Sequence, residues 1–155
     1  MSDDVTALLL KINPLVKGQM EVPMGTLLFG RMWNSWESSA IEDEIHTRKI
    51  DVIFNLLEES HGDINGAKEI WSPIDDYSIP SDIESFMSKV SSVIEELCLG
   101  KTVFVHCFGG VGRTSLALAS ILVKLGTPAA EALDRVHELA RGPETEEQKI
   151  FVRNL

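Results

Sequence analysis

The chain of 155 residues has the length of one ordinary domain and is long enough to bury a single core. Its hydrophobic content of 44% and charged content of 25% exclude a disordered or fibrous chain. Its formal net charge of −10 argues against nucleic acid or an anionic membrane as a partner, because both require a basic surface.

Apolar runs and helical periodicity predict strands that alternate with helices along the chain. In chain order they are a strand at Thr26–Phe29, a helix from Ser39 to about Arg48, strands at Asp51–Leu56 and Glu69–Trp71, a helix from Ser81 to just before Gly100, a strand at Thr102–His106, and helices from Ser115 to about Leu125, from Thr127 to about Ala140 and from Thr145 onward. Helix starts are marked by a capping residue followed three positions later by Glu or Gln, or by proline in the first helical position. These pairs are Ser39 with Glu42, Ser81 with Glu84, Thr145 with Gln148, and Thr127 with Pro128.

This alternation predicts an α/β fold: a single domain over residues 1–155, with a mostly parallel sheet of about four to five strands and helices on both faces. Ligands of such sheets lie beyond the carboxyl ends of the strands. The rule points to the segment that follows Thr102–His106.

That segment runs from His106 through Cys107 to Arg113 and Thr114, with Phe108, Gly109, Gly110, Val111 and Gly112 between the cysteine and the arginine. A glycine-rich loop between a strand and a helix can turn its N–H groups inward as an anion site, and the helix N-terminus adds positive field. The guanidinium of Arg113 supplies a fork suited to bidentate phosphate binding. The same field favours thiolate over thiol, so Cys107 is predicted to be a nucleophile. The plainer alternative is a buried structural cysteine before a turn.

These residues resemble the signature of the protein tyrosine phosphatase superfamily: a strand ending in His-Cys, five residues, Arg, then Ser or Thr. The chain is most similar to its compact dual-specificity and small archaeal-type members. The resemblance implies a phosphocysteine intermediate, with Thr114 donating to the cysteine sulfur and His106 bracing the loop through backbone contacts. It also implies hydrolysis of phosphotyrosine, with phosphoserine and phosphothreonine left open.

Phosphoryl transfer to sulfur leaves an alkoxide or phenoxide, so a general acid is needed. The stretch from Pro73 to Pro80 is similar to the acid-bearing loop of small phosphatases, and that alignment places the acid at Asp76, with Asp75 as the alternative. The stretch from Arg141 to Gln148 is similar to one in which a glutamine positions the hydrolytic water, but it is about two residues shorter. Gln148 is therefore a candidate for that role, with the helix cap as the alternative.

Lipid phosphatases of the superfamily carry lysines inside the loop, and this loop has none, which favours phosphorylated proteins as substrates. The alternatives are a catalytically weak module that binds phosphate or phosphoproteins, and a phosphatase acting on a non-protein phosphoester. Phe108 is either a wall of the loop or, as we expect, packed under the sheet.

Two cysteines are too few for a disulfide framework, and Cys98 is expected to be a core residue. The start of the chain, Met1–Asp4, is acidic where a secretory signal would be basic, and no apolar run reaches the roughly 20 residues of a membrane span. We therefore expect a cytoplasmic monomer without metal or cofactor and without membrane association. The sequence leaves the roles of Trp33 and Trp36 open.

Overall fold

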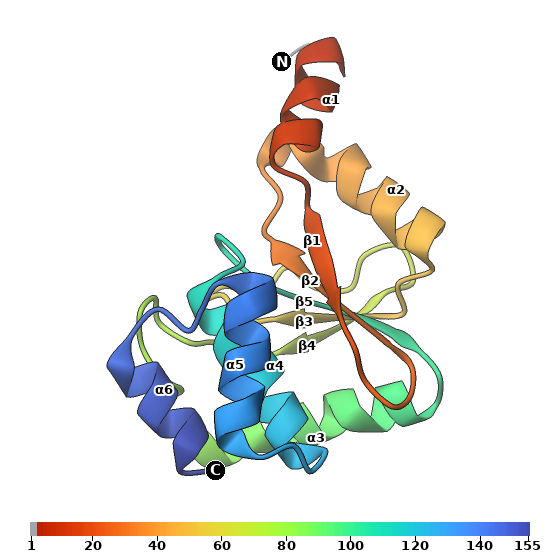
Figure 1. Cartoon of the computed structure of the whole chain (residues 1–155). Helices are drawn as coiled ribbons and strands as arrows, with labels where there is room; N and C mark the ends of the chain where they lie inside the picture. The colour runs from red at the N-terminus through yellow and green to blue at the C-terminus, as the bar shows by residue number, and fades with distance from the viewer. Residues whose placement is uncertain (1–2) are drawn as a thin grey trace.

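Five strands form one sheet in the computed structural model, which describes residues 3–155 (Figure 1). The strands are β1 (Val16–Met20), β2 (Thr26–Arg31), β3 (Val52–Asn55), β4 (Lys68–Trp71) and β5 (Thr102–Cys107), in the order β1-β2-β5-β3-β4. β1 runs antiparallel to β2, and the other three pairings are parallel. The predicted α/β fold with a mostly parallel sheet is confirmed. Met1 and Ser2, part of the acidic start considered above, lie outside the described residues.

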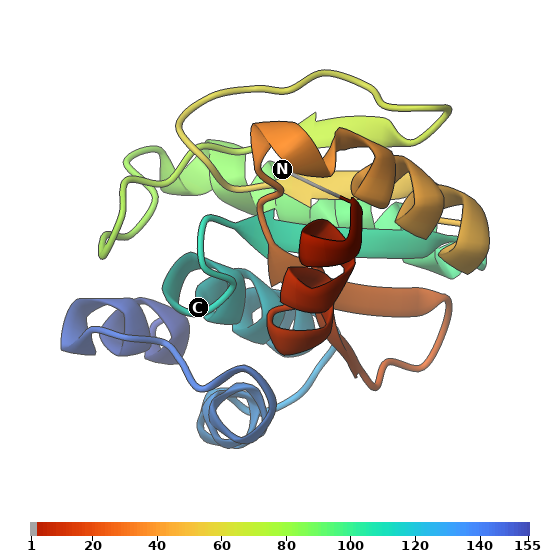
Figure 2. The ribbon, with the colours of Figure 1, turned by 90° about the horizontal axis from the view of Figure 1, so that it is seen from above.

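Helices cover both faces of this sheet (Figures 1 and 2). They are α1 (Asp3–Ile12), the short 3-10 helix η1 (Ser35–Glu37), α2 (Ser38–Arg48), α3 (Ile83–Cys98), α4 (Gly112–Lys124), α5 (Ala129–Ala140) and α6 (Glu146–Arg153). α2 packs on one face, and α3, α4, α5 and α6 contribute to the core on the other. Within residues 3–155, none of the helices is long and apolar enough to cross a membrane.

Successive residues of the central strands enter two different cores. Leu27, Phe29 and Val105 face the helices of the C-terminal half, whereas Leu28 and Phe104 face α2. Because both sets are buried, these strands have the continuous apolar character of a parallel sheet covered on both faces. A slip of β5 by one residue would exchange the two sets, so the register that carries Cys107 to the end of β5 is strongly specified.

Several predicted details differ from the structure. α1 and β1 were not predicted. β1 contains Lys17, Gly18 and Gln19 and is an edge strand with exposed positions, so it lacks the apolar run by which the other strands were predicted. α2 does not begin at a Ser39 cap. Instead, Asn34 and Glu37 form a capping box one turn earlier, at η1.

Two further expectations are corrected at helix ends. α3 is capped by Asp82, whose carboxylate accepts from the N–H of Ser85, and not by Ser81. Cys98 is not a core residue: it is the last residue of α3 and is exposed, because the helical period turns Val93 and Leu97 inward instead.

Candidate active site

The loop after β5 lies at the same edge of the sheet as the segments after β3 and β4, because these three strands are parallel. Residues 108–111 connect β5 to α4, which begins at Gly112. The segment after β3 carries Glu58, and the segment after β4 carries Asp76. The side chains discussed below converge at this edge.

The sulfur of Cys107 is held by two hydrogen-bond donors at the base of the loop. The N–H of Gly110 lies 3.3 Å from Sγ, and the hydroxyl of Thr114 lies 3.0 Å from it. Cys107 and Thr114 are both buried. Donors aimed at a sulfur stabilise the thiolate over the thiol.

Gly110 is the glycine on which the shape of this loop depends. Its φ is +82°, a conformation that strains any residue with a Cβ. A Cβ placed there would also lie 2.7 Å from the carbonyl oxygen of Gly30 on β2. At Gly109, by contrast, φ is ordinary and a Cβ would meet open space.

Arg113 is buried beside the sulfur-bearing loop and is held by several acceptors. Its Nη1 donates to the carbonyl of Ile74 at 2.9 Å and to the carboxylate of Glu58. Its Nη2 lies 3.6 Å from Oδ1 of Asp76. Its Nε is buried and has no hydrogen-bond partner among the residues described. A buried guanidinium with an unused donor is suited to a ligand that brings its own acceptor oxygens.

These groups surround a cavity of about 170 Å³, which is lined by Asp76, Tyr77, Cys107, Phe108, Gly109, Val111, Gly112, Arg113 and Glu144. The cavity is large enough to hold a phosphate group. The expectation that Phe108 packs under the sheet is wrong. Its side chain is 67% exposed and forms part of the cavity wall.

Asp76, and not Asp75, faces this cavity. The carbonyl of Asp75 accepts the N–H of Ser78 in a tight turn, and Oδ1 of Asp76 accepts the N–H of Tyr77 at 3.0 Å. More than half of the Asp76 side chain is exposed, so it can reach solvent as well as the mouth of the cavity. Asp76 is thus the aspartate of this loop that lies at the cavity, and its role as the general acid stays a prediction.

Gln148 is fully buried and is not among the residues that line the cavity. Its amide oxygen accepts the N–H groups of Glu144 and Thr145, and its Nε2 donates to the carbonyl of Ser78. The predicted capping box of Thr145 and Gln148 is confirmed. The side chain thereby links the N-terminus of α6 to the loop that carries Asp76.

Trp33 lies against two histidine rings behind the phosphate loop, with centroid distances of 5.0 Å to His61 and 5.2 Å to His106. Trp36 is exposed on η1. Burial, and to a smaller extent the neighbouring His61, lowers the pKa of His106 to about 3, so His106 is a neutral imidazole at physiological pH. His106 contacts the loop directly, because its Nδ1 lies 3.3 Å from the carbonyl oxygen of Cys107.

Sequence reasoning missed three residues of the site: Glu58, Tyr77 and Glu144. The first follows β3, so the rule that ligands gather beyond the carboxyl ends of parallel strands would have pointed to it. Tyr77 follows the predicted acid directly. Glu144 had no signal, because only the folded chain brings its side chain against Gly112.

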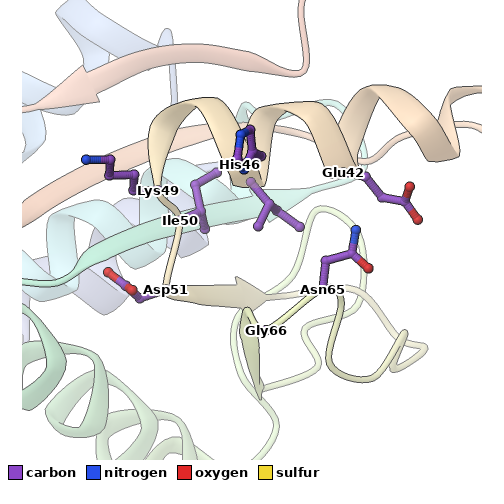
Figure 3. A pocket seen from close by; sticks show the side chains of 8 residues that line it. Glu42, His46, Lys49, Ile50, Asp51, Asn65 and Gly66 are labelled. Carbon is purple, nitrogen blue, oxygen red and sulfur yellow. The ribbon is translucent and has the colours of Figure 1, made fainter.

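A larger cavity, of about 400 Å³, lies at the opposite edge of the sheet, between the end of α2 and the turn at residues 65–66 (Figure 3). Its polar side chains include Glu42, His46 and Lys49. Glu42 and Lys49 point in opposite directions and do not converge on a common point. Cys107 and Arg113 therefore mark the better candidate site, although their cavity is smaller.

Solved structures of known phosphatases share this fold. The structure of Tk-PTP in the active form is 27% identical, with a TM-score of 0.70, over 91% of this chain and 95% of that one. DUSP15 is 16% identical, with a TM-score of 0.71, over 89% of this chain and 86% of that one. A mouse putative dual specificity phosphatase complexed with zinc tungstate is 16% identical, with a TM-score of 0.66, over 83% and 79% of the two chains. No curated protein matches the chain.

The mostly parallel sheet with a cysteine and an arginine in the loop after its central strand defines a cysteine-dependent protein phosphatase. Residues 31–127 match the model of the family described as "Polymorphic toxin system, DSP-PTPase phosphatase". The chain belongs to this family, within the protein tyrosine phosphatase superfamily.

Proposed function

We propose that Cys107 is the nucleophile of this phosphatase and that Arg113 clamps the phosphate. The observation that carries this proposal is the sulfur held by Gly110 and Thr114 in a cavity whose wall holds a buried, partly unpaired guanidinium. A phosphate bound there accepts a hydrogen bond from Nε of Arg113, and the N-terminus of α4 faces the negative charge of the phosphate. The sulfur is then placed for in-line attack on phosphorus.

The reaction proceeds in two steps. In the first, Sγ of Cys107 forms a bond to phosphorus while the bond to the leaving oxygen breaks, and Asp76 gives that oxygen a proton. In the second, water attacks the phosphocysteine, Asp76 takes a proton from the water, and the S–P bond breaks with its electron pair returning to sulfur. The hydroxyl of Thr114 stabilises the sulfur as it leaves, since it already donates to it in this structure.

The substrates are phosphorylated proteins, with phosphotyrosine first and phosphoserine or phosphothreonine as further substrates. Tyr77 and Phe108 give the mouth of the cavity two exposed aromatic side chains that can flank a phenyl ring. Phe108, Gly109, Gly110, Val111 and Gly112 surround the phosphate without adding a cation. Carboxylates of Glu58, Asp76 and Glu144 surround the mouth, which disfavours substrates with several phosphates.

A panel of matched phosphopeptides tests this function. Purified protein is expected to release phosphate from para-nitrophenyl phosphate and from phosphotyrosine peptides, and more slowly from the phosphoserine and phosphothreonine versions. Phosphate release is measured directly for each peptide. Binding of phosphopeptides without turnover would instead show a phosphate-binding module. Turnover of para-nitrophenyl phosphate with no peptide activity would point to a non-protein phosphoester.

The water-positioning role of Gln148 stays a prediction, because its amide is engaged in the cap. Gln148→Ala leaves backbone groups of Ser78, Glu144 and Thr145, which are partly buried, without this partner and is expected to lower stability by roughly 1 kcal/mol, measured by thermal unfolding. If the amide also orients water, the variant will accumulate phosphocysteine in a rapid-quench experiment. Lower stability without such accumulation would contradict the water-positioning role.

We further propose that the protein works as a monomer in the cytoplasm, without nucleic acid, membrane, metal or cofactor. The support is chemical: Cys98 and Cys107 are both free thiols, and a catalytic thiol needs a reducing compartment. The net charge of −10 disfavours polyanionic partners.

A further inference from the structure

Two histidines lie in contact behind the phosphate loop. Nε2 of His61 lies 3.2 Å from Nε2 of His106, and the two rings are inclined by only 22°. His61 belongs to the segment between β3 and β4, and His106 is the residue before Cys107 on β5. The proposed mechanism gives His61 no role.

The protons on His106 follow from its neighbours. The ring is fully buried, and the pKa lowered to about 3 leaves it neutral, with a single N–H. Nδ1 lies 3.3 Å from the carbonyl oxygen of Cys107, which can only accept. The proton therefore sits on Nδ1, and Nε2 faces His61 as an acceptor.

The protons on His61 follow in turn. Its Nε2 must donate to His106, because Nε2 of His106 carries no hydrogen in this arrangement. Its Nδ1 lies 2.7 Å from the carbonyl oxygen of Gly62 and 3.3 Å from Oε2 of Glu69, and neither of these can donate. The pair thus needs three N–H groups: Nδ1 of His106, and both Nε2 and Nδ1 of His61. Because His106 carries one of them, His61 carries two and is an imidazolium.

The surroundings of His61 suit a positive charge. Burial alone would raise the pKa of Glu69, but the hydrogen bonds from Ser60, Asn55 and the backbone of His61 together outweigh it and hold that pKa below its usual range, so this neighbour is a carboxylate. The Trp33 ring lies 5.0 Å from the His61 ring, centroid to centroid, within the range of a cation–π contact. The charged or titratable groups that act on this pair are Glu69 from β4 and Arg113 from α4.

We propose that His61 is a positively charged positioning residue for the phosphate loop. It does not touch the substrate. It holds His106 in the tautomer that donates to the Cys107 carbonyl, and this hydrogen bond fixes the peptide at the start of the loop. The positive charge of His61 also favours the thiolate of Cys107. This inference rests on the proposed role of Cys107 as nucleophile.

Nitrogen NMR of the wild-type protein labelled with ¹⁵N in its histidines tests the proton assignment directly. The expected spectrum at neutral pH shows both ring nitrogens of His61 protonated and only Nδ1 of His106 protonated. His46→Gln and His137→Gln assist the assignment, since both residues are exposed and lie outside this cluster. A neutral His61, or a proton on Nε2 of His106, would overturn the inference. This measurement needs no variant of His61 that folds.

Iodoacetamide alkylation of Cys107 as a function of pH tests the consequence, in a Cys98→Ser background that removes the exposed thiol. His61→Gln keeps a donor but loses the charge, and it is expected to raise the pH midpoint of alkylation by about one pH unit and to slow turnover at pH 6 roughly tenfold. The matched control His46→Gln should leave both unchanged. An unchanged midpoint in His61→Gln with reduced thermal stability would show a structural role only. If the Cys98→Ser protein itself showed no turnover, the proposed function would fail instead.

Discussion

Replacement of Cys107 by serine is expected to abolish turnover while the phosphate cavity stays intact. Removal of the covalent nucleophile of a serine protease lowers kcat by roughly 10⁶-fold, and a loss of similar size is expected here. The serine hydroxyl keeps the size of the side chain and accommodates the donors of Gly110 and Thr114, but it is not ionised at neutral pH. Turnover of para-nitrophenyl phosphate and calorimetric binding of a phosphotyrosine peptide measure the two effects.

Cys98→Ser is the matched control, because it removes the other thiol at an exposed helix end. It should retain full activity. Turnover by Cys107→Ser above about a hundredth of the wild-type rate would contradict the role of Cys107, because a variant without its nucleophile is expected to be far less active. Loss of peptide binding together with turnover would mean that the sulfur also shapes the cavity.

Asp76→Ala is expected to lower kcat by roughly 10²- to 10⁴-fold, the usual contribution of a general acid. Asp76 lines the cavity and lies 3.6 Å from Arg113, so its carboxyl can reach the oxygen that leaves phosphorus. The loss should be greatest for phosphoserine and smallest for para-nitrophenyl phosphate, whose leaving group needs the least protonation. Initial rates on the three substrates give this comparison.

Asp75→Ala provides the neighbouring control, since the Asp75 side chain is not part of the cavity wall. It should change the rate by less than Asp76→Ala on every substrate. A larger loss in Asp75→Ala would place the acid one position earlier and reverse the assignment of this loop.

The central part of the fold was predictable because it depends on local patterns. Thr102–His106 and Asp51–Leu56 are apolar runs with few interruptions, and they fall on β5 and β3 within a residue at each end. β1 was missed because an edge strand paired on one side needs no such run. Helix starts were less secure, since Asp82 and Asn34 compete with nearby serines as caps, and only tertiary contacts decide between them.

The phosphate loop was predictable for a similar reason: the nucleophile, the turn glycines and the arginine are contiguous in sequence. Asp76 required an alignment to a known loop, and the structure places it at the cavity. Glu58 and His61, from the segment between β3 and β4, and Glu144, before α6, were not predicted, because no spacing in the sequence relates them to Cys107. Phe108 was misplaced because an aromatic residue beside a buried strand is more often packed than exposed.

The contacts of Arg113 affect the release of the product, inorganic phosphate. Glu58 and Asp76 already contact Nη1 and Nη2 of Arg113, so a phosphate that pairs with the free Nε must compete with these carboxylates for the other two nitrogens. The affinity for phosphate is then the difference between two sets of charge-assisted contacts, and it is smaller than either set alone. When inorganic phosphate departs, the carboxylates return to the arginine. This internal competition limits product inhibition and makes release easier in a protein whose overall charge already repels the anion.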